Sequence, residues 1–156
     1  MSATICAIDP GKNGGIAWCR EGEKAVCVPM PATEGDLIVR IAAIDREACD
    51  GTVFYLEDLV RFMGKTPMSH MAVYASNWGL IKGAIMYSGS VLHIVKPQAW
   101  IKALALGTAN RGEKKTVWKN KLKARAQQLY PHLEITLKTA DALLLLEYAI
   151  KEQRGK

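Results

Sequence analysis

Long apolar runs are absent from this sequence, and their absence excludes a membrane-spanning helix. A bilayer span needs about 20 consecutive apolar residues, whereas the apolar run Ala142–Leu146 is short and is flanked by Asp141 and Glu147. The first residues, Met1–Thr4, also lack the charged segment and the apolar segment of a secretory signal. We therefore expect a cytoplasmic protein with no membrane partner.

Cysteine motifs are also absent. Cys6, Cys19, Cys27 and Cys49 form no CxxC pair, and no pair of histidines accompanies them. Three of them lie in apolar, strand-like segments, where cysteine behaves as a small hydrophobic residue. We expect reduced thiols rather than a zinc site or a disulfide framework.

Acidic residues are scarce in the second half of the chain. The 156 residues are 49% hydrophobic and carry a net charge of +6, which fits one globular domain, 1–156, with a core of its own. Between Lys96 and Lys138 the acids are only Glu113 and Glu134, against many lysines and arginines. Such a basic zone indicates either a polyanionic partner, with nucleic acid the first candidate, or a solvated helix face.

The apolar periodicity predicts an α/β domain around a mixed sheet. Strands are expected at 5–8, 16–18, 24–28, 52–56 and 91–95, the first three as an antiparallel meander. Helices are expected from Thr33 to near Asp50 and at about 69–87, 98–106, 114–130 and 140–153. Thr139 is the predicted N-cap of the last helix. Gly79 and Gly83 predict close packing of the long helix against another element, since each costs about 1 kcal/mol relative to alanine.

Three carboxylates stand at the ends of predicted elements. Asp9 ends the first strand, Glu57 ends the fourth, and Asp141 lies in the first turn of the last helix. If the two strands are parallel neighbours, the three side chains converge at one edge of the sheet. Converging carboxylates repel one another unless a cation neutralises them, and Mg²⁺ prefers oxygen ligands. Two such ions could hold the attacking and leaving oxygens of a phosphodiester.

Each acid also has a simpler interpretation. Asp9-Pro10-Gly11 is an ordinary turn sequence, the dipole of a helix favours Asp141 near its N-terminus, and Glu57 could pair with a surface lysine. The hypothesis of a metal site depends on the three acids together.

The order of these residues resembles the RuvC family of Holliday-junction resolvases, within the RNase H-like fold. Ile8–Gly11 with Gly14-Gly15 resembles the first-strand motif, Tyr55–Glu57 the second acidic motif, and Lys138–Leu144 the final-helix motif. The segment Phe62–Lys65 is similar to a loop whose aromatic residue is implicated in junction opening. The compact length resembles the phage-type branch.

This resemblance implies a five-stranded mixed sheet with helices on both faces. It implies a homodimer that binds a four-way DNA junction in a bacterial or phage-infected cell. The dimer would nick two opposed strands symmetrically with Mg²⁺ or Mn²⁺, two ions per subunit, and leave 5′-phosphate and 3′-hydroxyl ends. No nucleotide cofactor is implied. The long helix with Gly79 and Gly83 would form the dimer contact, since a twofold protein matches a twofold junction.

The roles follow from the resemblance and from charge. Asp9 would bridge both ions, Glu57 and Asp141 would each hold one side, and Lys114 would stabilise the phosphate, with Lys96 or Lys138 in support. Phe62 is either a wedge that stacks on an unpaired base or a buried loop anchor. The remaining candidates for phosphate binding are basic residues. Those from Lys119 to Arg125 could equally form a solvated helix face with no role in binding. They are Lys65, Lys115, Lys119, Lys121, Lys123 and Arg125.

The sequence departs from the family at one position. A further acid usually precedes the final Asp by three or four residues, where this chain has Lys138 and Leu137. Position minus three shares a helix face with Asp141, so Lys138 either removes a metal ligand or places a cation beside the phosphate. Asp58, Glu134 and Glu147 are the candidate substitutes.

Three other functions remain open. One is a related nuclease that cleaves RNA–DNA hybrids, flaps or other branched DNA. The second is a junction-binding protein without catalysis, which Lys138 favours. The third is a small ATP-handling protein, suggested by the turn Asp9–Gly15, although the chain has about half the length of a two-lobed cleft and no Walker motif.

Overall fold

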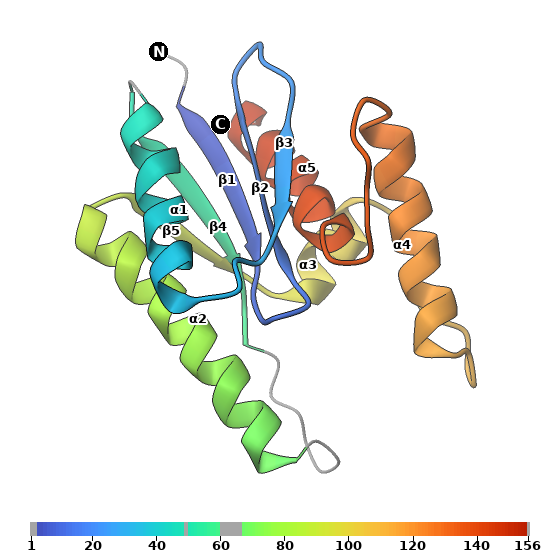
Figure 1. Ribbon diagram of the computed structural model, residues 1–156. Helices are drawn as coiled ribbons and strands as arrows, with labels where there is room; N and C mark the ends of the chain where they lie inside the picture. Colours follow the sequence, from blue (N-terminus) through green and yellow to red (C-terminus); the bar gives the residue numbers. More distant parts are fainter. Residues whose placement is uncertain (1–2, 49, 60–66, 156) are drawn as a thin grey trace.

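The computed structural model describes residues 3–48, 50–59 and 67–155 and shows a five-stranded sheet with helices on both faces (Figure 1). The strands are β1 (Thr4–Asp9), β2 (Gly15–Arg20), β3 (Val26–Pro29), β4 (Thr52–Glu57) and β5 (Val91–Val95). The helices are α1 (Glu34–Glu47), α2 (Met68–Ser88), α3 (Pro97–Ala103), α4 (Lys115–Leu129) and α5 (Ala140–Arg154). None of these helices combines the length and the apolar character that a bilayer crossing requires.

The sheet has the strand order β3-β2-β1-β4-β5. β1, β2 and β3 are antiparallel neighbours, as the predicted meander requires, whereas β4 pairs parallel with both β1 and β5. Ile8 lies opposite Leu56, and Glu57 lies opposite Val95. The carboxyl ends of β1, β4 and β5 therefore meet at one edge of the sheet, the lower edge in Figure 1. The first and fourth strands are thus parallel neighbours, which is the condition under which Asp9 and Glu57 were expected to converge.

Alternation along the strands divides the core into two layers. Ala7 and Tyr55 face a layer formed with α5. The first half of this helix, Ala140–Leu146, is buried and is apolar except for Asp141. The neighbouring residues of the same strands face the opposite layer, against α1 and α2. That layer contains Cys6, Ile8, Phe54, Leu56, Leu37, Ile41, Ile44, Ile81 and Ile85. A side-chain period of two is what a sheet covered on both faces requires.

Two local predictions differ from the structure. The 98–106 helix ends earlier, at Ala103, because Ala105 takes a left-handed φ of 52° and turns the chain away. Thr139 stands at the N-cap position of α5, but its hydroxyl makes no capping bond and instead bonds to Thr136.

The predicted packing of α2 at its glycines is wrong within this chain. Gly79 and Gly83 are both exposed, and a Cβ atom added at either would meet nothing within 4 Å among the described residues. The three described cysteines, Cys6, Cys19 and Cys27, are free thiols, as expected.

Candidate active site

Three acids from separate elements lie at the lower edge of the sheet. Asp9 is the last residue of β1, Glu57 is the last residue of β4, and Asp141 is in the first turn of α5. Helix α5 packs on β1, β2 and β4 and so brings Asp141 to the same edge. Glu57 and Asp141 are only 8% and 5% exposed, and Asp9 is half-buried. Buried acids of this kind need a compensating charge or a proton.

The charges of these acids influence one another. Burial is the main cause that raises the pKa of Asp9 well above its usual value, and the negative charges of Glu57 and Asp141 raise it further. Burial also raises the pKa of Glu57 to about 7, with a smaller contribution from Asp141, while a hydrogen bond from Trp100 lowers it. These interactions indicate that the fold brings the three acids near one another, while their role as metal ligands stays a prediction.

A lysine from α4 lies among the acids. The Lys119 ammonium donates to Oδ2 of Asp141. Burial opposes the charged form of Lys119, but the charges of Asp141, Asp9 and Glu57 outweigh burial and raise the pKa of the ammonium. The sequence indicated Lys119 only as a phosphate contact or a solvated residue, and the structure places it against an acid instead.

The donor set suits a hard divalent cation in kind. Carboxylate oxygens are the ligands that Mg²⁺ and Mn²⁺ prefer. Asp141 Oδ1 is buried and lacks a hydrogen-bond partner among the described residues. Among the residues that the structure describes, however, no three Asp, Glu, His or Cys side chains are grouped tightly enough to hold a metal ion as they stand. Cation binding would therefore require these side chains to move closer together.

Aromatic and amide side chains form hydrogen bonds with Glu57 and with the turn that follows Asp9. Trp100 Nε1 donates to Glu57 Oε2 at 2.8 Å, and Trp78 Nε1 donates to the carbonyl of Glu57 at 3.0 Å. Gly11 N donates to Asn77 Oδ1 at 2.7 Å, which ties the turn after β1 to α2. Tyr74, one turn before Trp78, lies near the acids, and burial followed by the charges of Glu57, Asp9 and Asp58 raises its pKa. Sequence reasoning missed these residues because no local pattern marks a contact between distant elements.

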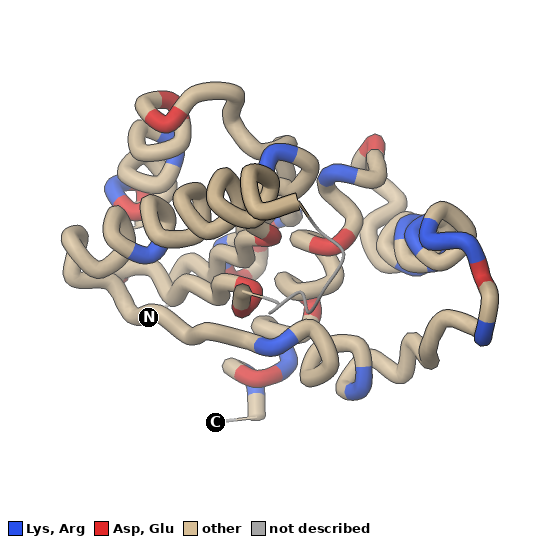
Figure 2. The backbone as a smooth tube through the Cα atoms, turned by 90° about the horizontal axis from the view of Figure 1, so that it is seen from below, with Lys and Arg blue, Asp and Glu red and all other residues tan. Residues whose placement is uncertain are grey.

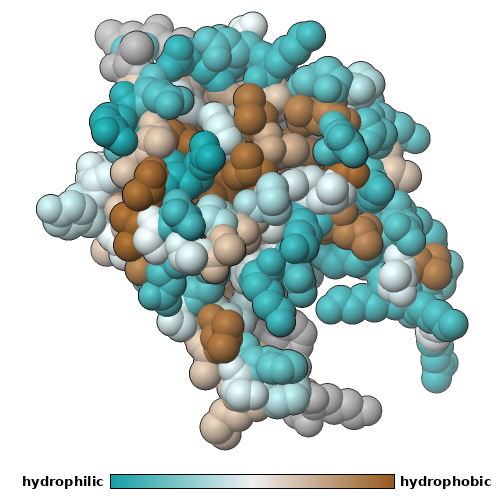
Figure 3. Space-filling model, viewed as in Figure 1, coloured by the Kyte–Doolittle hydropathy of each residue, from teal (hydrophilic) through white to brown (hydrophobic). Residues whose placement is uncertain are grey.

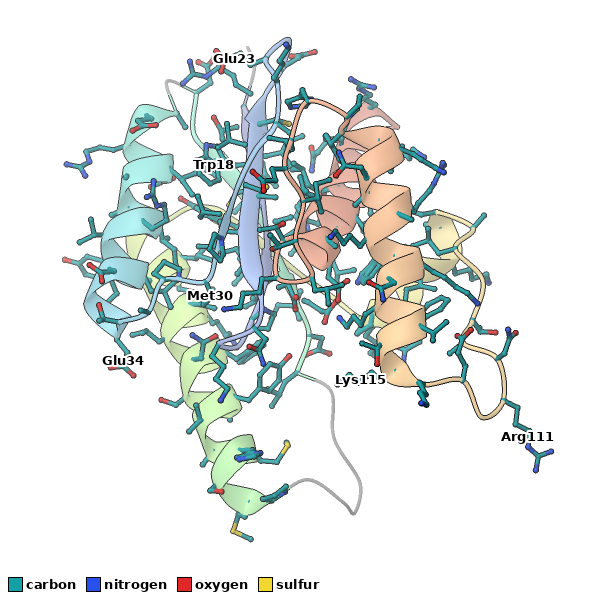
Figure 4. All side chains as sticks on the ribbon, turned by 45° about the vertical axis from the view of Figure 1, so that its right-hand side comes forward. Trp18, Glu23, Met30, Glu34, Arg111 and Lys115 are labelled. Carbon is teal, nitrogen blue, oxygen red and sulfur yellow. The ribbon has the colours of Figure 1, made fainter. Side chains whose placement is uncertain are left out.

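Several predicted basic residues lie at the starts of the helices α3, α4 and α5. Lys96 follows β5 and precedes α3, and Lys138 precedes α5; both are exposed. Lys114 and Lys115 begin α4 and are exposed as well. Figure 4 shows Lys115 at the lower end of α4 and Arg111 projecting from the loop before it. Seen from below, one group of lysines and arginines lies along α4, while others are scattered over the rest of the molecule (Figure 2).

The other predicted residues are Phe62, Lys65 and the three candidate substitutes for the missing acid. Phe62 and Lys65 fall in 60–66, outside the described residues. Asp58 follows Glu57 directly, and its carboxylate accepts a hydrogen bond from the backbone N–H of Leu59. Glu134 is exposed, and Glu147 accepts a hydrogen bond from the Tyr130 hydroxyl. Of the three substitutes considered for the missing acid, only Asp58 is adjacent in sequence to a member of the cluster.

The raised pKa values predict a stability that depends on pH. A folded acid with a raised pKa holds its proton more tightly than the unfolded chain does, so stability falls as pH rises from the ordinary value of 4.5 to about 7. One pKa unit corresponds to about 1.4 kcal/mol, so Glu57 alone would lower the free energy of unfolding of the metal-free protein by roughly 3 kcal/mol over that pH range. Thermal melts in a chelator should show this decline, and Glu57→Gln should make it shallower, because the raised pKa of Asp9 still contributes. A variant whose melting temperature declines with pH as steeply as that of the wild type would contradict the assignment.

These elements define the class of fold. The sheet has five strands, with a β1–β2–β3 meander and with β1, β4 and β5 parallel. Helices cover both faces, and acids stand at the ends of β1 and β4. This architecture is the RNase H-like fold.

Within that class the chain is similar in structure to RuvC. It superposes on Thermus thermophilus RuvC with a TM-score of 0.58 at 17% identity, covering 97% of this chain and 96% of that one. It superposes on T. thermophilus RuvC in complex with a Holliday junction substrate with a TM-score of 0.66 at 15% identity, covering 98% and 96%. No family model and no curated protein matches the sequence. At this identity the likeness establishes the fold, and it agrees with the family that the sequence motifs resemble.

Proposed function

We propose that this protein is a divalent-metal-dependent endonuclease that resolves four-way DNA junctions by paired nicks. The observation that carries the proposal is the convergence of Asp9, Glu57 and Asp141 at one sheet edge, in a fold shared with RuvC in complex with a Holliday junction substrate. Basic residues at the starts of α3, α4 and α5 supply a surface for a polyanion.

Asp9, Glu57 and Asp141 would hold the cation through their carboxylate oxygens. A bound Mg²⁺ or Mn²⁺ would polarise the scissile phosphate and make water a stronger nucleophile at neutral pH. Trp100 holds the Glu57 carboxylate in place through its hydrogen bond. Lys114, Lys96 and Lys138 are exposed and would neutralise phosphate charge as it develops during cleavage.

The DNA arms would lie beside α4 and the loop before it. Not every cation of α4 is equally available, because Lys121 pairs with Glu113 at 2.6 Å and Lys119 pairs with Asp141. Lys115 is exposed at the lower end of the helix (Figure 4). Contacts of this kind position the junction without reading its sequence, and they weaken as salt rises.

The homodimer would form through the outer face of α2. Gly79 and Gly83 are exposed with open space around them, and neighbouring apolar side chains are also exposed. Val73, Met86 and Tyr87 of α2 are 62%, 61% and 95% exposed, and Val91 of the edge strand β5 is 53% exposed. Apolar groups interrupt the hydrophilic surface on the left-hand side of Figure 3, over α1 and α2. A second copy packed on this face would place two sites on a twofold junction.

This dimer predicts a specific effect of Gly83→Glu. The monomer has room for the new side chain, and a helix gains up to about 1 kcal/mol when an exposed glycine is replaced. The variant should therefore fold at least as well as the wild type but dissociate into monomers, as measured by sedimentation equilibrium. Ala42→Glu on the exposed side of α1 is the control and should leave the dimer intact. A Gly83→Glu protein that remains as dimeric as the wild type would place the interface elsewhere.

A comparison of substrates tests the proposed function against a related nuclease. Purified protein with Mg²⁺ or Mn²⁺ is offered a four-way junction, an RNA–DNA hybrid, a flap and a linear duplex in parallel. The proposal predicts nicks in the junction alone, in pairs related by its twofold symmetry. Preferential cleavage of the hybrid or the flap would assign the same acids to another RNase H-like activity.

One observation favours a second candidate function, junction binding without cleavage. Lys119 contacts Asp141, and Lys138 stands where a fourth acid would be. A protein that shifts a junction in a gel in the presence of Mn²⁺ but never nicks it would support this alternative.

A further inference from the structure

A polar cavity lies at the edge of the sheet opposite the acids, where β4 and β5 begin (Figure 1). Its volume is about 320 Å³, within the range of small-molecule sites. The polar side chains that line it are Asp45, Asp50, Thr52, Ser88 and Ser90. Among the described residues of this lining there is no lysine, arginine or histidine, although the whole chain carries a net charge of +6. The cavity is therefore acidic in an otherwise basic protein.

The Thr52 hydroxyl at this cavity is buried and lacks a hydrogen-bond partner. Thr52 is 3% exposed, and its Oγ1 bonds to no residue that the structure describes. Side chains alternate along a strand, so Thr52 faces the same layer as Phe54 and Leu56, toward α1 and α2. Buried hydroxyls in folded proteins are hydrogen-bonded as a rule. Because Thr52 lines the cavity, a molecule bound there can supply the missing partner.

The Asp45 carboxylate lies at the same cavity without a basic partner. The Ser90 hydroxyl donates to Asp45 Oδ1 at 2.7 Å. No lysine, arginine or histidine of the described chain pairs with this carboxylate. Because Ser90 gives its proton to Asp45, the Ser90 oxygen is an acceptor, and it lies 2.8 Å from the Ser88 hydroxyl. The cavity thus offers hydrogen-bond acceptors to a ligand.

Two helix ends add negative potential to these acceptors. α1 ends at Glu47 and α2 ends at Ser88, beside the cavity. The last carbonyl groups of a helix carry a partial negative charge. The last turn of α2 has no basic residue, and Arg46 in the last turn of α1 does not line the cavity. The helix ends and Asp45 together favour a cation.

The donor groups that the cavity requires are those of an organic ammonium. No three Asp, Glu, His or Cys side chains in the described ranges are grouped to hold a metal ion. A primary ammonium carries several N–H donors and no acceptor, so it can bond to one carboxylate and to neutral oxygens at the same time.

We infer that this cavity binds a primary ammonium group, carried by a small diamine or by a lysine side chain. The Asp45 carboxylate would accept from the ammonium and neutralise its charge, and the hydroxyl oxygens of Thr52 and Ser90 would accept its other N–H groups. The inference does not depend on the proposed function, because the site uses none of the residues assigned to cleavage.

Titration with putrescine tests this inference, followed by amide chemical shifts in nuclear magnetic resonance spectra and by calorimetry. Butanediol has the same carbon chain without the charges. We expect saturable shifts at Thr52, Ser88 and Ser90 with a dissociation constant of about 1 mM or lower, and no saturable shifts with butanediol. A lysine amide acetylated at its α-nitrogen is titrated in parallel. Whichever ammonium compound binds more tightly identifies the source of the group.

Two substitutions locate the binding. Asp45→Asn removes the charge and keeps an oxygen that can accept from Ser90, and it should weaken putrescine binding at least about tenfold. Thr52→Val removes a hydroxyl that has no partner, so the fold should keep its stability while putrescine binding falls about threefold or more. Asp36→Asn is the matched control, because Asp36 is an exposed acid at the other end of α1. It should bind putrescine like the wild type.

Three results would overturn the inference. They are a wild type that shows no saturable binding, butanediol that binds as tightly as putrescine, and an equal affinity for putrescine in Asp45→Asn and Asp36→Asn. The comparison of putrescine with butanediol uses the wild type alone, so it decides the matter even if a variant fails to fold.

Discussion

Replacing Asp9 by asparagine should abolish nicking of a four-way junction while junction binding persists. Asp9 ends the central strand β1, and its charge interacts with those of Glu57, Asp141 and Lys119. The amide keeps the shape but loses the charge that a cation requires, so cleavage should fall at least about 100-fold. Binding depends on the exposed lysines rather than on the acids, so the gel shift should remain within a few-fold of the wild type.

Two measurements separate this effect from a loss of folding. Asp9→Asn removes an acid that burial and neighbouring charges disfavour, so the metal-free variant should be at least as stable as the wild type near pH 8. Asp36→Asn is the control, because Asp36 is exposed in the first turn of α1 and its carboxylate accepts a hydrogen bond from the Thr33 hydroxyl, a bond that an amide oxygen can also accept. Cleavage that survives Asp9→Asn, or is lost equally in Asp36→Asn, would overturn the assignment of the site.

Replacing Gly14 by alanine should severely destabilise the protein. A Cβ atom at Gly14 would lie 2.0 Å from the carbonyl oxygen of Asp9 and 2.8 Å from that of Pro10. Both neighbours are backbone atoms of the turn that joins β1 to β2, so neither can rotate away as a side chain could. We expect a loss of about 3 kcal/mol or more, at the upper end of the cost of overpacking, measured by urea unfolding.

Gly22→Ala provides the matched control in the second turn of the meander. Gly22 has a φ of 82°, but a Cβ atom there meets nothing within 4 Å among the described residues. Only the left-handed backbone is then strained, at a cost of about 1 kcal/mol. Equal losses from the two substitutions would show that the contact at the first turn does not constrain the end of β1 and the position of Asp9.

The sequence predicted the elements that depend on local pattern. The five strands and the five helices follow from alternation, helical spacing and the turns that separate them, whereas helices on both faces of the sheet are what the resemblance to the RuvC family implies. The convergence of Asp9, Glu57 and Asp141 could also be predicted, because their positions at the ends of β1, β4 and the start of α5 fix where a parallel pair of strands must bring them.

Features that depend on packing between distant elements could not be predicted. The hydrogen bond from Trp100 to Glu57 spans 43 residues, and that from Gly11 to Asn77 spans 66. Lys119 looked like any other lysine of a basic helix, since only the rotation of α4 against α5 turns it toward Asp141. The glycines of α2 are a case in which the sequence predicted a contact that is not found. Their spacing suggests close packing, but no described part of the same chain packs against them.

The most direct test of the account is a strand-by-strand cleavage assay on a synthetic four-way junction. Each of the four strands is labelled in turn, the junction is incubated with the protein and Mn²⁺, and the products are sized and treated with DNA ligase. We expect one nick in each of two opposed strands, at symmetric positions, with ends that the ligase seals. Unpaired nicks, ends that resist sealing, or an uncut junction that the protein nevertheless binds would contradict it.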